Sequence, residues 1–197
     1  MISVRRLVAT LGLSTALLVS SAGVAAAESW QYSDPQRDVL TITDDDTVVA
    51  APDQVAGDVV ATSISYTPRR VVIKIRMRAV PRESWGVFAV IRTPRTSFDL
   101  TYFKLGQLGF YDLTKSSSGD DVRCRAKTFR VQGNAVVLTV SRRCLGKPSA
   151  VRVGAGVAVY DGDLFTEEDE DVAVFADDAL RRAIGEDLRL SPRIRRG

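Results

Sequence analysis

The chain contains no histidine among its 197 residues. This absence excludes the Ser-His-Asp and Cys-His triads of many hydrolases and the usual catalytic zinc sites. It also removes histidine as an axial ligand for haem. An active site in this chain would therefore have to use other proton donors and acceptors.

Cysteine is nearly as scarce, because the chain has only Cys124 and Cys144. An even number of cysteines in an exported chain predicts a disulfide, which would stabilise the fold by about 3 kcal/mol. A redox function would need a closely spaced Cys-x-x-Cys pair, and these two residues do not have that spacing. With both thiols in a disulfide, carboxylates are the main catalytic candidates.

The chain also lacks a long uncharged apolar run after residue 27, so no transmembrane helix is predicted there. The first residues have another pattern: Arg5 and Arg6 precede an apolar run over residues 7–19, and small alanines follow at residues 25–27. This order is typical of a secretory signal peptide. We expect residues 1–27 to be removed and the secreted, extracellular chain to begin near Glu28.

Net charge is close to zero once the signal peptide is gone, because loss of Arg5 and Arg6 lowers it from +3 to +1. A near-neutral protein has little general attraction for nucleic acid or anionic membranes, so we expect neither as a partner. The remaining length suits one domain. We predict a β-sandwich domain over residues 28–190 and a basic flexible tail over residues 191–197.

Residues 69–80 alternate between apolar and cationic side chains. The apolar set is Val71, Ile73, Ile75, Met77 and Ala79, and the cationic set is Lys74, Arg76 and Arg78. A period of two predicts a β-strand with one buried face. Because later segments repeat the pattern, we predict an all-β fold: an antiparallel, jelly-roll-like β-sandwich with at most one short helix, over residues 179–184.

Two further patterns predict local detail. Gly133-Asn134 is typical of a hairpin turn, and it would pair Val131 with Val136 and Phe129 with Leu138, all on the buried face. This register brings the two cysteines close, and a disulfide between them predicts a bulge or a strand end near residues 141–144. Residues 151–159 alternate as well, and glycines at 154 and 156 predict a segment packed closely over that strand.

Several short motifs carry a resemblance. They are Asp34, Pro35, Asp38 and Val39, then Arg123-Cys124, residues 142–148, and Ala176-Asp177-Asp178-Ala179. Together they resemble a family of small secreted actinobacterial proteins of unknown function. The chain is more faintly similar to carbohydrate-binding sandwiches that include DOMON domains and family 9 carbohydrate-binding modules. The resemblance implies export, a disulfide and an all-β fold, and it implies no activity.

Acidic residues suggest a metal site, because calcium binds carboxylate and carbonyl oxygens and is abundant outside cells. Asp34 and Asp38 lie in one acidic segment, and Asp161 and Asp163 lie in another. Neither segment matches an EF-hand loop. These four residues are our candidate calcium ligands, and a solvated acidic surface is the alternative.

A binding surface is suggested by Trp85 and by the stripe of Lys74, Arg76 and Arg78. Aromatic faces stack on sugar rings, and arginines bind the carboxylate or phosphate groups of cell-wall polymers. The alternatives are that Trp85 fills the core and that the stripe is an ordinary solvated sheet face.

We therefore expect a secreted, non-catalytic β-sandwich that binds a carbohydrate or another cell-envelope component. One alternative is a carboxylate-dependent glycoside hydrolase, with its acid and base drawn from Asp161, Asp163, Glu167 and Glu168. The other is a structural envelope protein that binds no small ligand.

Overall fold

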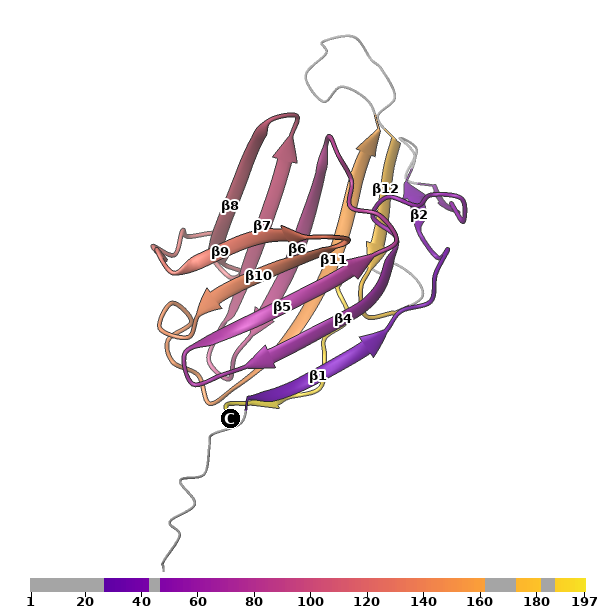
Figure 1. Ribbon diagram of the computed structural model, residues 1–197. Coiled ribbons are helices and arrows are strands. Elements are labelled where there is room, and N and C mark those ends of the chain that lie inside the picture. The colour runs from indigo at the N-terminus through magenta and orange to yellow at the C-terminus, as the bar shows by residue number, and fades with distance from the viewer. Residues whose placement is uncertain (1–26, 43–46, 162–172, 182–186) are drawn as a thin grey trace, which may run out of the picture.

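The computed structural model describes residues 27–42, 47–161, 173–181 and 187–197 (Figure 1). The strands of these residues are β1 (Glu28–Ser33), β2 (Leu40–Ile42), β3 (Val48–Ala50), β4 (Val59–Tyr66), β5 (Arg70–Met77), β6 (Trp85–Arg92), β7 (Ser97–Leu105), β8 (Leu108–Lys115), β9 (Lys127–Gln132), β10 (Ala135–Ser141), β11 (Ala150–Asp161), β12 (Ala173–Asp178) and β13 (Ile194–Arg195). These ranges contain no helix. Of the helix expected over residues 179–184, Ala179 and Leu180 form a turn, and residues 182–186 lie outside the described ranges.

The strands form two antiparallel sheets that face each other (Figure 1). The five-stranded sheet has the order β1-β4-β5-β10-β9. The eight-stranded sheet has the order β3-β2-β12-β11-β6-β7-β8, and β13 pairs with β11. The predicted all-β fold with an antiparallel sandwich is confirmed.

Strand β5 shows how the alternating sequence builds the core. Val71, Ile73, Ile75 and Met77 are fully buried between the sheets, whereas Lys74 and Arg76 are exposed on the outer face. Each buried side chain removes apolar surface from water and so stabilises the packing of the two sheets. The predicted strand is confirmed, and its cationic side chains face solvent.

The predicted hairpin register is confirmed, because Val131 pairs with Val136 and Phe129 pairs with Leu138. One detail is wrong: Val131 is half exposed rather than buried. Strand β9 is the last strand of its sheet, so the end of its inner face extends past the core. Phe129, nearer the core, is packed against it.

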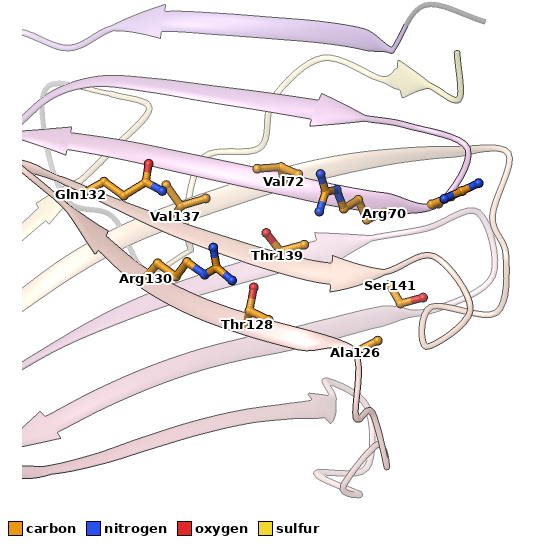
Figure 2. A pocket seen from close by; sticks show the side chains of 10 residues that line it. Arg70, Val72, Ala126, Thr128, Arg130, Gln132, Val137, Thr139 and Ser141 are labelled. Atoms are coloured by element: carbon orange, nitrogen blue, oxygen red, sulfur yellow. The ribbon is translucent and has the colours of Figure 1, made fainter.

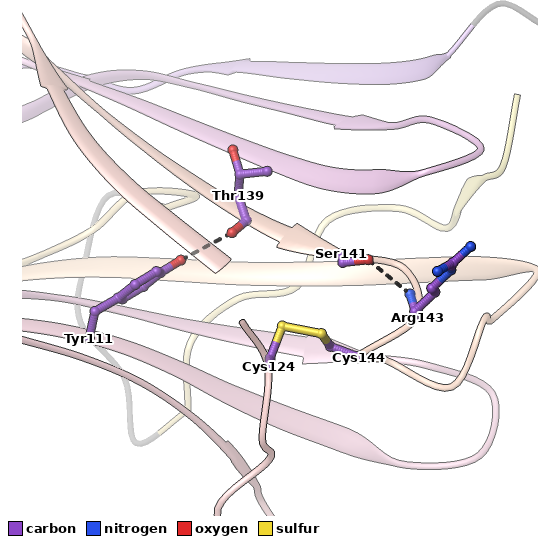
Figure 3. The surroundings of a disulfide bond; sticks show 6 residues. All are labelled: Tyr111, Cys124, Thr139, Ser141, Arg143 and Cys144. Atoms are coloured by element: carbon purple, nitrogen blue, oxygen red, sulfur yellow. Dashed lines mark hydrogen bonds between the residues drawn. A yellow bond between two sulfur atoms is a disulfide. The ribbon is translucent and has the colours of Figure 1, made fainter. Parts of the chain in front are cut away.

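The predicted disulfide between Cys124 and Cys144 is confirmed, with the two Cα atoms 5.6 Å apart (Figure 3). Strand β10 ends at Ser141 and a turn follows, so of the predicted bulge or strand end the structure has the strand end. In this turn the backbone amide of Arg143 donates to the hydroxyl of Ser141 at 3.3 Å. The disulfide therefore closes the open end of the β9–β10 hairpin.

Strand β11 is covered as its glycines predicted. A Cβ atom at Gly154 would lie 2.9 Å from the carbonyl oxygen of Arg189 and 3.0 Å from Cβ of Leu188. A Cβ atom at Gly156 would lie 3.0 Å from Leu188 as well. Only glycine leaves room for this segment over the strand.

The prediction of a flexible tail over residues 191–197 is wrong. Ser191 is fully buried and its hydroxyl accepts the backbone amide of Val153 at 3.0 Å. Ile194 is also buried, and β13 pairs with Ala150 and Val151 of β11. Backbone pairing and one apolar side chain hold a segment that its basic composition suggested would be free.

No helix within the described residues is long and apolar enough to cross a membrane.

Candidate functional site

Trp85 does not form a binding platform. It is the first residue of β6 and only 1% of its surface is exposed. Its ring centroid lies 5.3 Å from that of Tyr102 and 5.9 Å from that of Phe129. A side chain buried among other rings cannot stack on a polysaccharide, so the structure contradicts the predicted ligand role and supports the alternative of a core residue.

Arg78 does not belong to the exposed stripe either. Strand β5 ends at Met77, and the guanidinium Nη1 of Arg78 lies 2.8 Å from Oδ2 of the buried Asp58. The alternation along residues 69–80 continues beyond the end of the strand, so it could not show that Arg78 turns towards a carboxylate. Lys74 and Arg76 remain exposed.

Lys74 and Arg76 lie on what we call the cationic face, the outer surface of the five-stranded sheet. The strand registers place the following side chains on it: Ser29, Gln31 and Ser33 of β1; Ala61, Ser63 and Ser65 of β4; Arg70, Val72, Lys74 and Arg76 of β5; Ala135, Val137, Thr139 and Ser141 of β10; and Thr128, Arg130 and Gln132 of β9. Four of these residues are cationic, none is acidic and none is aromatic. Most of the others are small or carry a hydroxyl group.

A hollow of about 440 Å³ lies on this face over β5, β10 and β9 (Figure 2). Val72 and Val137 contribute its apolar part, and Arg70 and Arg130 contribute guanidinium groups. A neighbouring hollow of about 280 Å³ includes Lys74 and Arg76 in its lining.

None of the four cations of the face makes an ion pair with any residue that the structure describes. Their donors are therefore available to solvent or to a ligand. Guanidinium groups bind carboxylate and phosphate through two parallel hydrogen bonds, and a lysine ammonium binds the same groups as a point charge. The face suits an anion.

A second charged region lies where the two sheets meet beside β1 and β12. We call it the carboxylate cluster, and it consists of Asp34, Asp38, Asp58, Asp177 and Asp178. Asp34 follows β1 and Asp58 precedes β4, and these two strands belong to the five-stranded sheet. Asp38 lies before β2, and Asp177 and Asp178 are the last residues of β12; these two strands belong to the eight-stranded sheet.

Asp58 and Asp177 each have one carboxylate oxygen that accepts hydrogen bonds from described residues. Oδ2 of Asp58 accepts the backbone amide of Arg37 at 2.9 Å as well as Arg78. Oδ2 of Asp177 accepts the backbone amide of Val59 at 2.7 Å. Arg37 has a φ of 68°, a left-handed conformation that costs energy in a residue with a side chain, and it directs this amide at Asp58.

Asp178 is satisfied in a different way. Its Oδ1 accepts the amide of Leu180 at 3.1 Å, and its Oδ2 accepts Nε of Arg181 at 2.7 Å and the amide of Arg189 at 3.0 Å. The carboxylate thus caps the turn after β12 and holds the segment that covers β11. Asp178 has a complete set of structural partners.

Burial raises the pKa of Asp34 to about 9, and repulsion from Asp177, Asp38, Asp178 and Asp58 adds to the effect. Burial also raises the pKa of Asp177 to about 7, although the hydrogen bond from Val59 opposes the shift. Both effects disfavour the charged form of a carboxyl group. Burial and mutual repulsion in the cluster therefore favour the binding of a proton or of a cation.

The candidate calcium ligands divide in the structure. Asp34 and Asp38 come together, with Asp58 and Asp177 as partners that sequence reasoning missed. Asp161 lies elsewhere: it ends β11, exposed, four residues beyond Val157, the residue that pairs with Asp177, and this separation is about 13 Å at about 3.3 Å per residue. Asp163, Glu167 and Glu168 lie outside the described residues.

Comparison with family models, with curated proteins and with solved structures finds no match for this chain. The resemblance to actinobacterial secreted proteins and to carbohydrate-binding sandwiches stays a prediction. The functional argument therefore depends on the two charged regions.

Proposed function

We propose that this protein is an extracellular, non-catalytic binding module that holds an anionic cell-envelope polysaccharide on its cationic face. The observation that carries the proposal is the composition of that face, which has four cations without an ion pair and no acidic side chain across five strands. Its complement is a ligand that carries several negative charges.

The spacing of the cations favours a polymer over a single small anion. Lys74 pairs with Val137, which pairs with Arg130, so the two cations lie two strands or about 10 Å apart. Arg76 is two residues from Lys74 on the same strand, about 7 Å away. A chain with repeated charges can meet several of these groups at once, and a single carboxylate or phosphate cannot.

The absence of aromatic rings on this face distinguishes between polymers. Neutral sugars and single-stranded nucleic acids bind proteins largely by stacking on aromatic side chains, and the cationic face offers none. Its serine and threonine hydroxyls can instead hydrogen-bond sugar hydroxyls between the charges. A phosphate- or carboxylate-bearing glycan fits this combination.

The expected location agrees with this ligand. Residues 1–27 have the pattern of a secretory signal peptide, and the Cys124–Cys144 disulfide is of the kind that persists in oxidising compartments outside the cytosol. An exported protein would meet the envelope polymers directly.

The test is depletion of the purified protein from solution by insoluble bacterial cell wall. A variant with Lys74→Ser, Arg76→Ser and Arg130→Ser removes three charges from the face, and Arg95→Ser with Arg123→Ser and Arg193→Ser removes three exposed charges elsewhere. We expect the face variant to bind at least about tenfold more weakly, because charge-assisted hydrogen bonds contribute about 1.5 kcal/mol or more each before solvent screening. The control variant should bind like the wild type.

Walls from which phosphate polymers have been extracted, and walls whose carboxyl groups have been amidated, separate the two anion sources. Loss of binding to one of these preparations identifies the group. Equal binding by the face variant, tighter binding to single-stranded DNA, or release of soluble sugar from the wall would each contradict the proposal, and the last would support the hydrolase alternative.

A further inference from the structure

The carboxylate cluster joins segments that are distant in the sequence. Carboxylate oxygens of Asp38, Asp58 and Asp177 lie within 4.8 Å of one another. Asp34 lies beside this group of three: its backbone amide donates to the carbonyl of Val60 at 3.1 Å, and the amide of the adjacent Val59 donates to Asp177. The residues come from the ends of strands in both sheets. Whatever neutralises this charge therefore also ties the five-stranded sheet to the eight-stranded sheet.

Several oxygens of the cluster have no protein donor. Asp34 is 7% exposed, and neither of its carboxylate oxygens accepts a hydrogen bond from the described residues. Asp58 is fully buried, and its Oδ1 has no donor among the described residues, although Oδ2 has two. Buried carboxylate oxygens without donors are costly, and native proteins keep them mainly where another group binds them.

Charge adds to this argument. The cluster contains the carboxylates of Asp34, Asp38, Asp58 and Asp177. Asp34 and Asp177 make no ion pair with a described residue, and Asp58 pairs with Arg78. Asp178 makes its own pair with Arg181. Buried like charges repel strongly at short range, so the group needs a further cation when all four carboxylates are ionised.

We propose that Asp34, Asp38, Asp58 and Asp177 bind a calcium ion that links the two sheets. Calcium takes six to eight oxygen ligands at about 2.3–2.6 Å, so oxygens on opposite sides of the ion lie up to about 5 Å apart. The 4.8 Å limit on the separation of the three oxygens fits inside that sphere. Asp38 as a whole is only half buried, so the site lies near the surface, although both carboxylate oxygens of Asp38 are enclosed.

The donor set selects the ion. All of the ligands are carboxylates, the chain has no histidine, and both cysteines are in the disulfide, so soft transition metals lack their preferred ligands. Magnesium keeps several waters and seldom uses a cage of four protein carboxylates. Calcium is the divalent ion that best matches a flexible, oxygen-only site outside the cell.

The experiment is thermal unfolding of the full purified protein after treatment with EDTA, with calcium or magnesium then added to about 10 mM, together with calorimetric titration of calcium. For an extracellular site with a Kd of about 0.1 mM, we expect calcium to raise Tm by about 5 °C or more. Magnesium should raise it much less. An unchanged Tm with no calcium-dependent heat, or an equal response to magnesium, overturns the proposal.

Asp34→Asn supplies the sharpest variant, because the Asp34 side chain has no hydrogen bond to lose to a described residue and asparagine has nearly the same shape. In EDTA its Tm should equal or exceed that of the wild type, since the cost of burying an ionisable carboxyl group is gone, and the rise with calcium should be lost. Asp121→Asn, an exposed residue outside the cluster, should keep the full response. A calcium response that survives Asp34→Asn unchanged contradicts the assigned ligands. The outcome is independent of the polymer assay, because that assay tests the cationic face and not the carboxylate cluster.

Discussion

The two charged regions differ in how the fold treats their charge. On the cationic face, four groups of the same sign lie about 7–10 Å or more apart in water, where repulsion is weak and salt screens it further. In the carboxylate cluster, groups of the opposite sign are buried within a few ångströms, where repulsion is strong. Exposed like charges therefore destabilise the ligand-free protein little, whereas buried like charges need a counter-ion for the folded state to be stable.

The regions also differ in what holds the chain around them. The disulfide closes the β9–β10 hairpin that forms one side of the cationic face. At the carboxylate cluster the described cross-links are hydrogen bonds, such as Val59 to Asp177 and Arg37 to Asp58. The following predictions separate the two regions, from the largest expected effect to the smallest.

Removal of the disulfide tests the support of the face. Cys124→Ser with Cys144→Ser should lower the free energy of unfolding by about 3 kcal/mol, because the unfolded chain regains the freedom of the closed loop. Urea denaturation measures this loss, and the calcium-dependent rise in Tm should persist. A loss of the calcium response in this variant would show that the two regions are not independent.

Asp58→Ala tests the support of the cluster. The substitution removes the acceptor of the Arg37 amide and the ion-pair partner of Arg78. We expect a loss of about 2 kcal/mol in urea denaturation with calcium present, because buried donors are left without a partner. Asp112→Ala breaks the exposed pair with Lys127 and is the matched control, for which almost no change is expected. Similar losses in both variants would contradict the special role of the buried cluster.

The pH dependence of the calcium-free protein tests the sign of the buried charge. The pKa values of Asp34 and Asp177, about 9 and about 7, lie above the unfolded value of about 3.9. The folded state therefore binds more protons than the unfolded state between these values, and stability falls as pH rises. Asp38, Asp58 and Asp178 act on both of these carboxyls, and Arg78 pairs with Asp58.

In EDTA we expect Tm to decrease from pH 5 to pH 9, with a shallower decrease for Asp34→Asn. Scanning calorimetry at three pH values measures the slope. A Tm that is flat or that increases over this range would show that the carboxyls of the cluster ionise without cost in the folded protein.

The smallest expected effect on stability is on the cationic face. Lys74→Ser should change Tm by no more than about 2 °C, since exposed substitutions away from special contacts have small effects. The same substitution should weaken binding to cell wall and reduce its dependence on salt. A large loss of stability would mean that the face is held by contacts within the protein rather than left open for a ligand.

Local patterns were sufficient for much of the fold. Alternation along β5 predicted that Ile73 and Ile75 are buried and that Lys74 is exposed, because a strand places successive side chains on opposite faces. The turn at Gly133-Asn134 predicted the register of β9 and β10. The same patterns gave wrong predictions at two residues. Arg78 is not on the exposed face because the strand has ended, and Val131 is not buried because its strand is at the edge of the sheet.

The candidate sites could be predicted only in part. Asp34 and Asp38 stood out in the sequence because they share one short acidic segment. Asp58 and Asp177 gave no sign of a shared site, since they lie more than a hundred positions apart in the sequence. The sequence left the role of Trp85 open between a binding surface and the core. A tryptophan after a proline and a loop gives no sign of which way its ring will point.

The sequence by itself determined the alternation of buried and exposed side chains and the hairpin, because both depend on residues a few positions apart. It also determined the disulfide, because two cysteines allow only one pairing within the chain. Only the tertiary structure decided that Asp38, Asp58 and Asp177 would meet, that Trp85 would be enclosed and that the basic tail would pair with β11. These outcomes depend on how two sheets pack against each other. Packing brings together residues more than a hundred positions apart, as the hydrogen bond from Val59 to Asp177 shows.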